Sequence, residues 1–270
     1  MQPRIIVLTA VAAAAVSVAA GCSSSKNSPS SPPASPGAGD ATSGPAISGT
    51  VTVFAAASLK EAFTTLASQF ESDHPGSHVK LSFGASSDLA EQINQGAPAD
   101  VFASASPKNM QQVISAGGAS TSTNFVKNVM EVAVPPSNPA HVTSVTDLAK
   151  SSVKVALCQP QVPCGSTAQK VFTNAGITVK PVTLEPDVKS VLGKVTLGEV
   201  DAGMVYVTDV LAAGSAVKGV EIPDNVNAST TYPIAALSKA PNPTTAAAFV
   251  AYVLSPAGQQ VLSAAGFQSP

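Results

Sequence analysis

The segment at residues 51–61 constrains the fold of this chain more than any other stretch. It reads Val-Thr-Val-Phe-Ala-Ala-Ala-Ser-Leu-Lys-Glu, a short apolar strand that runs directly into a helix. Ser58 is predicted to cap this helix, and Glu61 three residues later completes a capping box. Apolar residues then recur at three- and four-residue spacings as far as Phe70, which predicts one buried helix face. The segment therefore predicts a sheet covered by helices, and its serine suits either an ordinary turn or an anion site.

Strand-to-helix turns of this kind recur along the chain. An alternating strand at residues 79–83 leads to Ser86, Ser87 and Asp88, all favourable at a helix N-terminus. Ser166 and Gln169 predict another capping box. Further strands are expected at 100–103, 129–134, 153–157, 182–184, 203–206, 220–222 and 232–237, and further helices at 108–116, 146–150, 187–192, 208–213, 244–254 and 255–265. The repeated strand–helix order implies an α/β fold with parallel strands flanked by helices.

The repeat occurs twice, which predicts two lobes. The expected boundaries are residues 48–128 plus 232–270 for lobe I, residues 133–228 for lobe II, and crossing strands near 129–134 and 229–237. Pro135 and Pro136 mark the point where the chain is expected to leave the first lobe. A ligand cleft is expected between the lobes.

The first residues form a predicted targeting segment. Arg4 precedes an apolar run from Ile5 to Ala20, and this pattern resembles a bacterial lipoprotein signal with cleavage before Cys22. We therefore expect residues 1–21 to be a signal peptide and Cys22 to carry a lipid. A single membrane-spanning anchor is the alternative, but the apolar run is shorter than the ~20 residues that a span requires.

Residues 22–49 are rich in Ser, Pro, Gly and Ala and have almost no large apolar side chain. Such a segment cannot bury a core, so we expect a disordered tether that reaches on the order of 30 Å. The protein is thus expected at the cell membrane, lipid-anchored on its extracytoplasmic side. In that oxidising compartment Cys158 and Cys164 are expected to form a disulfide.

The composition argues against several other classes of function. Only 11% of the residues are charged and the formal net charge is −2, so nucleic acid is not an expected partner. Two cysteines and three scattered histidines (His74, His78 and His141) are too few for a zinc site. Phosphate-binding and dinucleotide-binding glycine motifs are absent, and we expect neither a metal cation nor a cofactor.

Four strand-to-helix turns carry small polar groups, and each helix N-terminus offers unpaired N–H donors. The turns contain Ser58, Ser86, residues 164–166 and residues 187–188. Ligands of doubly wound folds lie at the carboxyl ends of the strands, so two turns from each lobe can meet in one cleft. This arrangement suits a small tetrahedral oxyanion that is bound without a counter-cation. The alternative is a cell-envelope hydrolase using Ser86 or Cys164 as the nucleophile. The chain has no Gly-x-Ser-x-Gly motif, however, and a disulfide-bonded Cys164 could not act as a nucleophile.

Three charged residues near these turns are expected to have structural or surface positions. Asp100 follows a proline at the start of a strand, which favours a cap or a turn. Lys60 and Lys189 fall in the first turns of helices, where a cation is mildly unfavourable. Surface exposure is the preferred interpretation for both lysines, and contact with an anion is the alternative.

Over nearly all of residues 50–268, the chain resembles the bacterial molybdate-binding proteins of ABC uptake systems. The motifs that carry the resemblance are Val53-Phe-Ala-Ala-Ala-Ser58-Leu, Phe83-Gly-Ala-Ser86-Ser87-Asp88-Leu89, Gly96-Ala-Pro-Ala-Asp100-Val-Phe, Val162-Pro-Cys164-Gly165 and Gly203-Met-Val-Tyr206. The resemblance implies a two-lobed, periplasmic-binding-protein-like fold of type II. In each lobe a sheet is flanked by helices, and the ligand cleft lies between the lobes.

The resemblance also implies the ligand contacts. The hydroxyl groups of Ser58, Ser86 and Tyr206 are expected to bind the oxyanion, together with backbone N–H groups of both serines, Cys164 and Val188. Ser87 is the alternative to Ser86. Relatives are expected to have alanine at position 164, so the pairing of Cys164 with a second cysteine is the main departure from the family pattern.

The function implied is high-affinity binding of molybdate or tungstate and delivery to an ABC permease with its ATPase. The implied protein is a monomer and not an enzyme. A receptor for another small oxyanion, such as sulfate or phosphate, is the alternative within the same class. Because molybdate, tungstate and sulfate all carry two negative charges, size rather than charge must separate sulfate from the other two.

Overall fold

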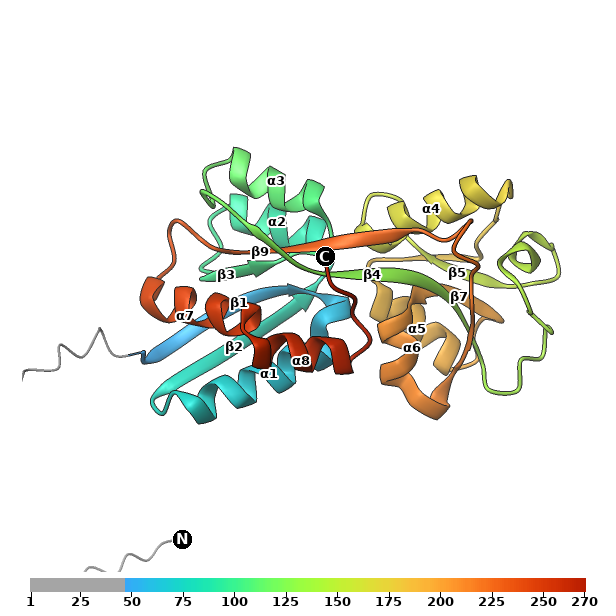
Figure 1. The fold of residues 1–270 in the computed structure, drawn as a ribbon. Helices are drawn as coiled ribbons and strands as arrows, with labels where there is room; N and C mark the ends of the chain where they lie inside the picture. Colours follow the sequence, from blue (N-terminus) through green and yellow to red (C-terminus); the bar gives the residue numbers. More distant parts are fainter. Residues whose placement is uncertain (1–46) are drawn as a thin grey trace, which may run out of the picture. The chain divides into compact units, whose positions relative to one another are not determined.

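In the computed structural model, which describes residues 47–270, nine strands form one curled, mixed sheet (Figure 1). The predicted signal peptide, Cys22 and nearly all of the predicted tether lie outside the described residues. The strands are β1 (Gly49–Ala56), β2 (Ser77–Gly84), β3 (Val101–Ala103), β4 (Thr123–Val134), β5 (Val155–Cys158), β6 (Thr183–Glu185), β7 (Ala202–Tyr206), β8 (Lys218–Val220) and β9 (Ser229–Ala236). Their order is β2-β1-β3-β9-β4-β7-β5-β6, with β8 paired to β4.

Eight α-helices and three short 3-10 helices connect the strands of the described chain. The α-helices are α1 (Lys60–Asp73), α2 (Ser86–Asn94), α3 (Pro107–Ser115), α4 (Pro163–Ala175), α5 (Val188–Thr196), α6 (Val207–Ala213), α7 (Pro243–Leu254) and α8 (Pro256–Ala264). The 3-10 helices are η1 (Ala57–Leu59), η2 (Val145–Ala149) and η3 (Gly214–Ala216).

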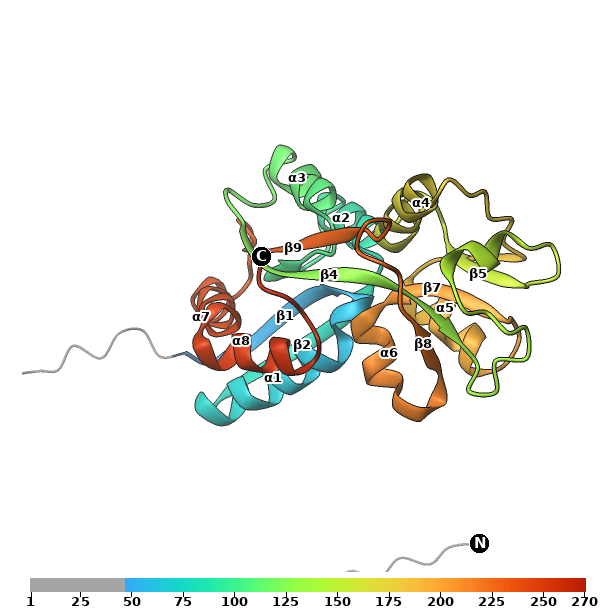
Figure 2. The same ribbon diagram turned by 45° about the vertical axis from the view of Figure 1, so that its right-hand side comes forward.

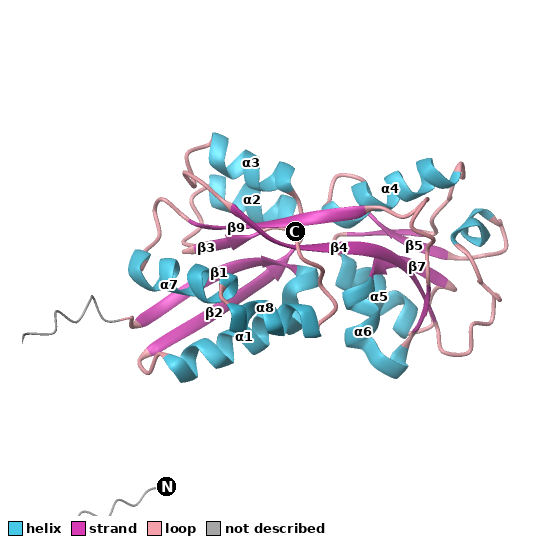
Figure 3. Ribbon diagram, in the orientation of Figure 1, coloured by secondary structure: helices cyan, strands magenta, loops and turns pink. Residues whose placement is uncertain are grey.

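Strand β1 shows why helices cover both faces of the sheet. Val51, Val53 and Ala55 are buried in one hydrophobic cluster, whereas Phe54 is buried in another. The first cluster includes apolar residues of α1, α7 and α8, and the second includes those of α2 and α3. Because successive side chains of a strand point to opposite faces, β1 holds a helical layer on each side (Figure 3). These elements, with β2 and β3, form lobe I.

Lobe II is built in the same way on β5, β6 and β7. Strand β5 pairs in parallel with both β6 and β7, as β1 pairs in parallel with both β2 and β3. A third hydrophobic cluster fills this lobe and includes Val171 and Phe172 of α4 and Val191 and Val195 of α5. The predicted parallel α/β units are therefore confirmed in both lobes. The residue boundaries that we predict for the lobes stay a prediction.

Strands β4 and β9 connect the two groups of parallel strands (Figure 2). They pair antiparallel over residues 123–129 and 229–234, with one register shift. The remainder of β4 then pairs with β7, and the end of β9 pairs with β3. Strand β4 thus pairs with strands of both lobes, whereas β9 joins β4 to β3 of lobe I.

At three of the predicted helix starts the expected side-chain cap does not form. The chain makes the 3-10 turn η1 before α1, and neither Ser58 nor any other side chain caps α1 or η1. Helix α2 follows Ala85 without a side-chain cap. Helix α4 starts at Pro163 because proline suits the first turn, so Ser166 lies inside the helix and its hydroxyl donates to the Pro163 carbonyl.

Other local predictions are confirmed. Asp187 caps α5, its Oδ1 accepting the Ser190 N–H at 3.0 Å, and Pro256 opens α8. The predicted helix at 146–150 is the 3-10 helix η2, and the strand predicted at 220–222 lies two residues earlier as β8. The predicted disulfide between Cys158 and Cys164 is present.

Asp100 has the structural role that the sequence predicts. Its side chain is buried, Oδ2 accepts the Thr52 N–H of β1 at 2.7 Å, and Oδ1 accepts the Asn242 N–H at 2.7 Å. Asn242 in turn caps α7. One carboxylate therefore ties the start of α7 to the central strand of lobe I.

We predict that Asp100→Ala lowers the free energy of unfolding by ~2 kcal/mol or more, because two backbone donors lose a charged acceptor. Urea unfolding of the full chain measures the change. Asp224→Ala, at an exposed position, is the control and is expected to change stability by less than ~0.5 kcal/mol. Equal stability of the two variants would contradict this role of Asp100.

Candidate functional site

The five residues that we expect to bind a ligand line one small cavity. Lobe I contributes Ala56, Ala57, Ser58, Gly84, Ala85, Ser86 and Ala105, and lobe II contributes Pro163, Cys164, Asp187, Val188 and Tyr206. The cavity volume is about 20 Å³, which suits a small ligand and not an extended one. Ala57 and Ala85 also belong to the hydrophobic cluster of lobe II, so the lobes are in contact around the cavity.

Ser58 reaches across to the long connecting strand β9 instead of capping its helix. Its Oγ lies 2.8 Å from Tyr232 Oη, and both side chains are buried. Asn128 Nδ2 lies 3.5 Å from the same Tyr232 Oη, and its orientation is set because Asn128 Oδ1 accepts the Val129 N–H. Asn128 Nδ2 also donates to Thr208 Oγ1 at 2.8 Å. Tyr232 can accept from Asn128 and donate to Ser58, and either hydroxyl group of the Ser58–Tyr232 pair can be the donor. When Tyr232 is the donor, the hydroxyl proton of Ser58 is free for a ligand.

The hydroxyl oxygen of Ser86 also accepts a hydrogen bond, in this case from a backbone group. The Ala105 N–H donates to Ser86 Oγ at 2.9 Å, and Ser86 is completely buried. A backbone amide can only donate, so the hydroxyl proton of Ser86 is also free. Ser87, the alternative, is half-buried, bonds to Asp88 and does not line this cavity.

Tyr206 ends strand β7, as predicted, and lines the cavity. The side chain is 1% exposed, and its Oη has Thr167 and Tyr232 as polar neighbours but makes no hydrogen bond of normal geometry among the described residues. Burial, and next to it the neighbouring Tyr232, raise the pKa of Tyr206 well above its usual value. The phenol therefore keeps its proton at any physiological pH and is a third free donor.

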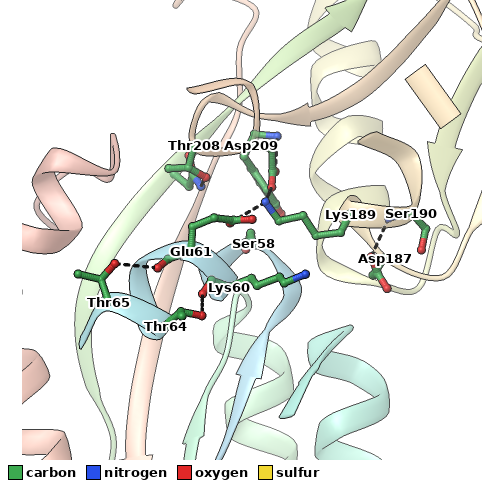
Figure 4. Close-up of polar contacts among 12 residues, drawn as sticks. Ser58, Lys60, Glu61, Thr64, Thr65, Asp187, Lys189, Ser190, Thr208 and Asp209 are labelled. Atoms are coloured by element: carbon green, nitrogen blue, oxygen red, sulfur yellow. Dashed lines mark hydrogen bonds and ion pairs between the residues drawn. The ribbon is translucent and has the colours of Figure 1, made fainter. Parts of the chain in front are cut away.

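Cys164 and Val188 stand in the first turns of α4 and α5, where backbone N–H groups lack intrahelical partners. The disulfide joins Cys164 to Cys158 at the end of β5 and so fixes the start of α4 next to the strand. Asp187 also lines the cavity, but its Oδ1 is occupied by the cap of α5 (Figure 4).

No lysine or arginine lines this cavity in the described chain. Lys60 is exposed, as predicted. The surface position predicted for Lys189 is wrong: its side chain is 20% exposed and its Nζ lies 2.7 Å from Glu61 Oε2 and 2.9 Å from Asp209 Oδ1 (Figure 4). Burial works to lower the pKa of Lys189, but the two carboxylates outweigh it and raise the pKa. The charge of Lys189 is thus already matched by protein groups.

Three buried residues of the site were missed in the sequence. Tyr232 and Asn128 orient Ser58, and Asp209 Oδ2 accepts the backbone N–H of Tyr206 at 3.1 Å. Tyr232 and Asn128 lie on the connecting strands, where no motif marks them. Asp209 follows Tyr206 by three residues at the start of α6, a spacing that does indicate a helix-start contact.

The fold and this cavity describe a two-lobed binding protein, and the chain belongs to the family of bacterial extracellular solute-binding proteins, whose family model matches residues 51–268. A relative is the molybdate-binding protein ModA of Mycobacterium tuberculosis, which is 41% identical over 90% of this chain and 91% of its own length. Family membership places the protein outside the cytoplasm and among binding proteins rather than enzymes.

Two solved structures share the fold. The periplasmic molybdate-binding protein of Azotobacter vinelandii has a TM-score of 0.72 with 22% identity, covering 82% of this chain and 99% of that one. The sulfate-binding protein SubI of Mycobacterium tuberculosis has a TM-score of 0.71 with 18% identity, covering 82% of this chain and 86% of that one. At these identities the likeness concerns the fold alone.

Within residues 47–270, none of the helices has the length and apolar character needed to cross a membrane. The same residues contain no group of three or more His, Cys, Asp or Glu side chains arranged to hold a metal ion.

Gly165 provides a test of how the disulfide loop positions α4. A methyl group at this position would clash with the Gln159 carbonyl oxygen, a backbone atom that cannot move aside easily. We predict that Gly165→Ala lowers the melting temperature. Gly193→Ala in α5, where a methyl group meets no atom within 4 Å, is expected to raise it, because alanine favours a helix by roughly 0.8–1 kcal/mol over glycine. Thermal unfolding followed by circular dichroism distinguishes the two, and a rise in both variants would contradict the close packing at Gly165.

Proposed function

We propose that this protein binds molybdate, and tungstate equally, outside the cytoplasmic membrane and delivers the anion to an ABC permease and its ATPase. The 41% identity to a molybdate-binding protein over 90% of the chain supports the ligand. The observation in the structure that carries the proposal is the set of three buried hydroxyl groups at one cavity, those of Ser58, Ser86 and Tyr206.

These hydroxyl groups can all donate at the same time. Ser86 accepts from the Ala105 N–H, Ser58 can accept from Tyr232, and Tyr206 Oη makes no hydrogen bond among the described residues. First-turn N–H groups of the surrounding helices add further donors and the positive ends of helix dipoles. A cavity that mainly donates suits a ligand whose whole surface accepts hydrogen bonds, which is the character of a fully deprotonated tetrahedral oxyanion.

The same polarity argues against hydrogen phosphate as the ligand. Its hydroxyl group needs an acceptor, and each of the three hydroxyl groups is arranged to donate. A buried donor that faces another donor costs ~1–3 kcal/mol. Asp187 is the only carboxylate at the cavity within the described residues, and since its Oδ1 accepts from Ser190, Oδ2 is the oxygen that it could offer to that hydroxyl group. Three donors against this one acceptor make phosphate the weaker of the alternatives.

Sulfate is the stronger alternative, since it is also a dianion without protons. Sulfate is smaller than molybdate. If the donors are spaced to contact molybdate, some of them lack a hydrogen-bond partner when sulfate is bound. At ~1–3 kcal/mol per unsatisfied buried group, one lost contact weakens sulfate about 5- to 150-fold. Molybdate and tungstate have nearly equal bond lengths, and the same argument separates them poorly.

Membrane anchoring, oligomeric state and recognition by the permease complete the proposed function. We propose that Cys22 carries a lipid that anchors the chain to the membrane through the tether, that the protein acts as a monomer, and that it needs no cofactor. Closure of the two lobes around the anion would give the permease a distinct surface to recognise.

Isothermal titration of the full chain with molybdate, tungstate, sulfate and hydrogen phosphate tests the ligand. We expect similar affinities for molybdate and tungstate, and an affinity for sulfate at least about fivefold lower, for the reason of size given above. Hydrogen phosphate is expected to be weaker still. Sulfate binding as tightly as molybdate would overturn the assignment and favour a sulfate receptor.

Replacement of the serines tests the site. Ser58→Ala and Ser86→Ala are each expected to lose ~1–3 kcal/mol of molybdate affinity, because each removes one hydrogen bond to a charged ligand. Tyr206→Phe is expected to lose less if water enters the cleft. Ser87→Ala is the matched control, since it alters the neighbouring hydroxyl that does not line the cavity. Unchanged affinity in the Ser58→Ala and Ser86→Ala double variant would show that the anion binds elsewhere.

A further inference from the structure

One ion pair joins the two lobes in the described part of the chain. Lys189 Nζ of α5 in lobe II lies 2.7 Å from Glu61 Oε2 of α1 in lobe I. The other ion pairs join residues of a single lobe: Lys150 with Asp147, Lys194 with Glu199, and Lys189 with Asp209. The sequence does not reveal the contact between lobes, because the two residues are 128 positions apart.

The lobe II side of this contact is fixed to the candidate site. Asp209 is completely buried and holds Lys189 at 2.9 Å through Oδ1, while its Oδ2 accepts the Tyr206 N–H. Lys189 itself directly follows Val188, the first residue of α5 and part of the cavity lining. A buried carboxylate without a cation is strongly destabilising, so Asp209 keeps Lys189 in place whether or not Glu61 is near.

On the lobe I side of this contact, the Glu61 side chain is less constrained than Lys189. The Glu61 side chain is 49% exposed, and it lies in the first turn of α1, directly after the η1 turn that carries Ser58 (Figure 4). If the lobes separate, Glu61 becomes solvated at little cost and Lys189 keeps Asp209. The contact between Glu61 and Lys189 therefore exists only when the two halves of the cavity are together.

We propose that Glu61 and Lys189 form a latch between the lobes, which raises oxyanion affinity by holding the cavity closed although neither residue touches the ligand. The inference rests on the proposed function, since it concerns the affinity of that same site. It assigns a role to two charges that the neutral donor set at the cavity does not use.

The latch and the overall electric field of the protein predict opposite effects of Glu61→Gln on molybdate affinity. Glu61→Gln removes one negative charge, and a less negative protein attracts a dianion more strongly. If Glu61 acted only through its field, this variant would bind molybdate with equal or higher affinity. If Glu61 is part of a latch, the variant releases molybdate faster, because the open state forms more easily.

The chain offers a matched control. Glu199 pairs with Lys194 at 2.6 Å within lobe II, and its side chain is 48% exposed, close to the 49% of Glu61. Glu199→Gln removes the same charge from a similar ion pair but breaks no contact between lobes. Glu61 is preferred to Lys189 for the test, because loss of Lys189 would leave buried Asp209 unpaired and damage the lobe itself.

Dissociation of molybdate from the full chain, measured by stopped flow at low ionic strength, is the first readout. We expect Glu61→Gln to release molybdate about two- to fivefold faster than the wild type, the range for a partly exposed ion pair. Glu199→Gln is expected to match the wild type. The difference should shrink at ~1 M salt, where charges are screened within about 3 Å.

Hydrogen exchange of the ligand-free proteins is the second readout and does not depend on the ligand. Peptides that cover the cavity-lining turns at 84–90, 162–168 and 186–192 are expected to exchange faster in Glu61→Gln than in the wild type or in Glu199→Gln. Faster exchange supports the latch even if the wild type fails to bind molybdate, a failure that would overturn the proposed function alone. Exchange equal to that of the wild type, or unchanged or slower release of a bound oxyanion, would overturn the latch.

Discussion

The antiparallel pairing of β4 with β9 is the interaction on which the candidate site depends. A parallel α/β unit presents helix N-termini at one edge of its sheet, and a single unit of this kind would leave them open to solvent. Because β4 continues into the sheet of lobe II and β9 into the sheet of lobe I, the carboxyl ends of the two strand groups face each other. The cavity is the place where turns from both lobes meet.

The chemistry of this cavity follows from the absence of lysine and arginine among the described residues that line it. A dianion held by lysine or arginine would be bound through charge, and charge is the same for several oxyanions. Hydroxyl and amide donors instead act over short distances and in fixed directions, so the size and protonation of the ligand decide how many contacts form. Behind the cavity, the Ala105 amide donates to Ser86, and the Tyr232 hydroxyl, next to Asn128, pairs with Ser58, so both serines can direct their protons to a ligand.

Charged residues are present near the site, but the structure pairs them with one another. Lys189 lies between a buried and a half-exposed carboxylate, and through Asp209 it is connected to the backbone of Tyr206. The positive charge therefore stabilises the protein around the site, and the described residues that line the cavity offer neutral donors. This division explains how a chain with 11% charged residues can form an anion site between two lobes.

Much of the fold was determined by local sequence alone. The period-two and helical patterns, Asp187 as a cap and the two cysteines each depend on residues close together in the chain, and the structure confirms them. The same local logic failed for Ser58, whose hydroxyl has a buried partner 174 positions away and leaves the helix uncapped. Lys189 likewise has a partner in the other lobe, 128 positions distant. Only the tertiary structure decided these contacts, because a hydroxyl or an ammonium group bonds to whatever the folded chain brings within about 3 Å.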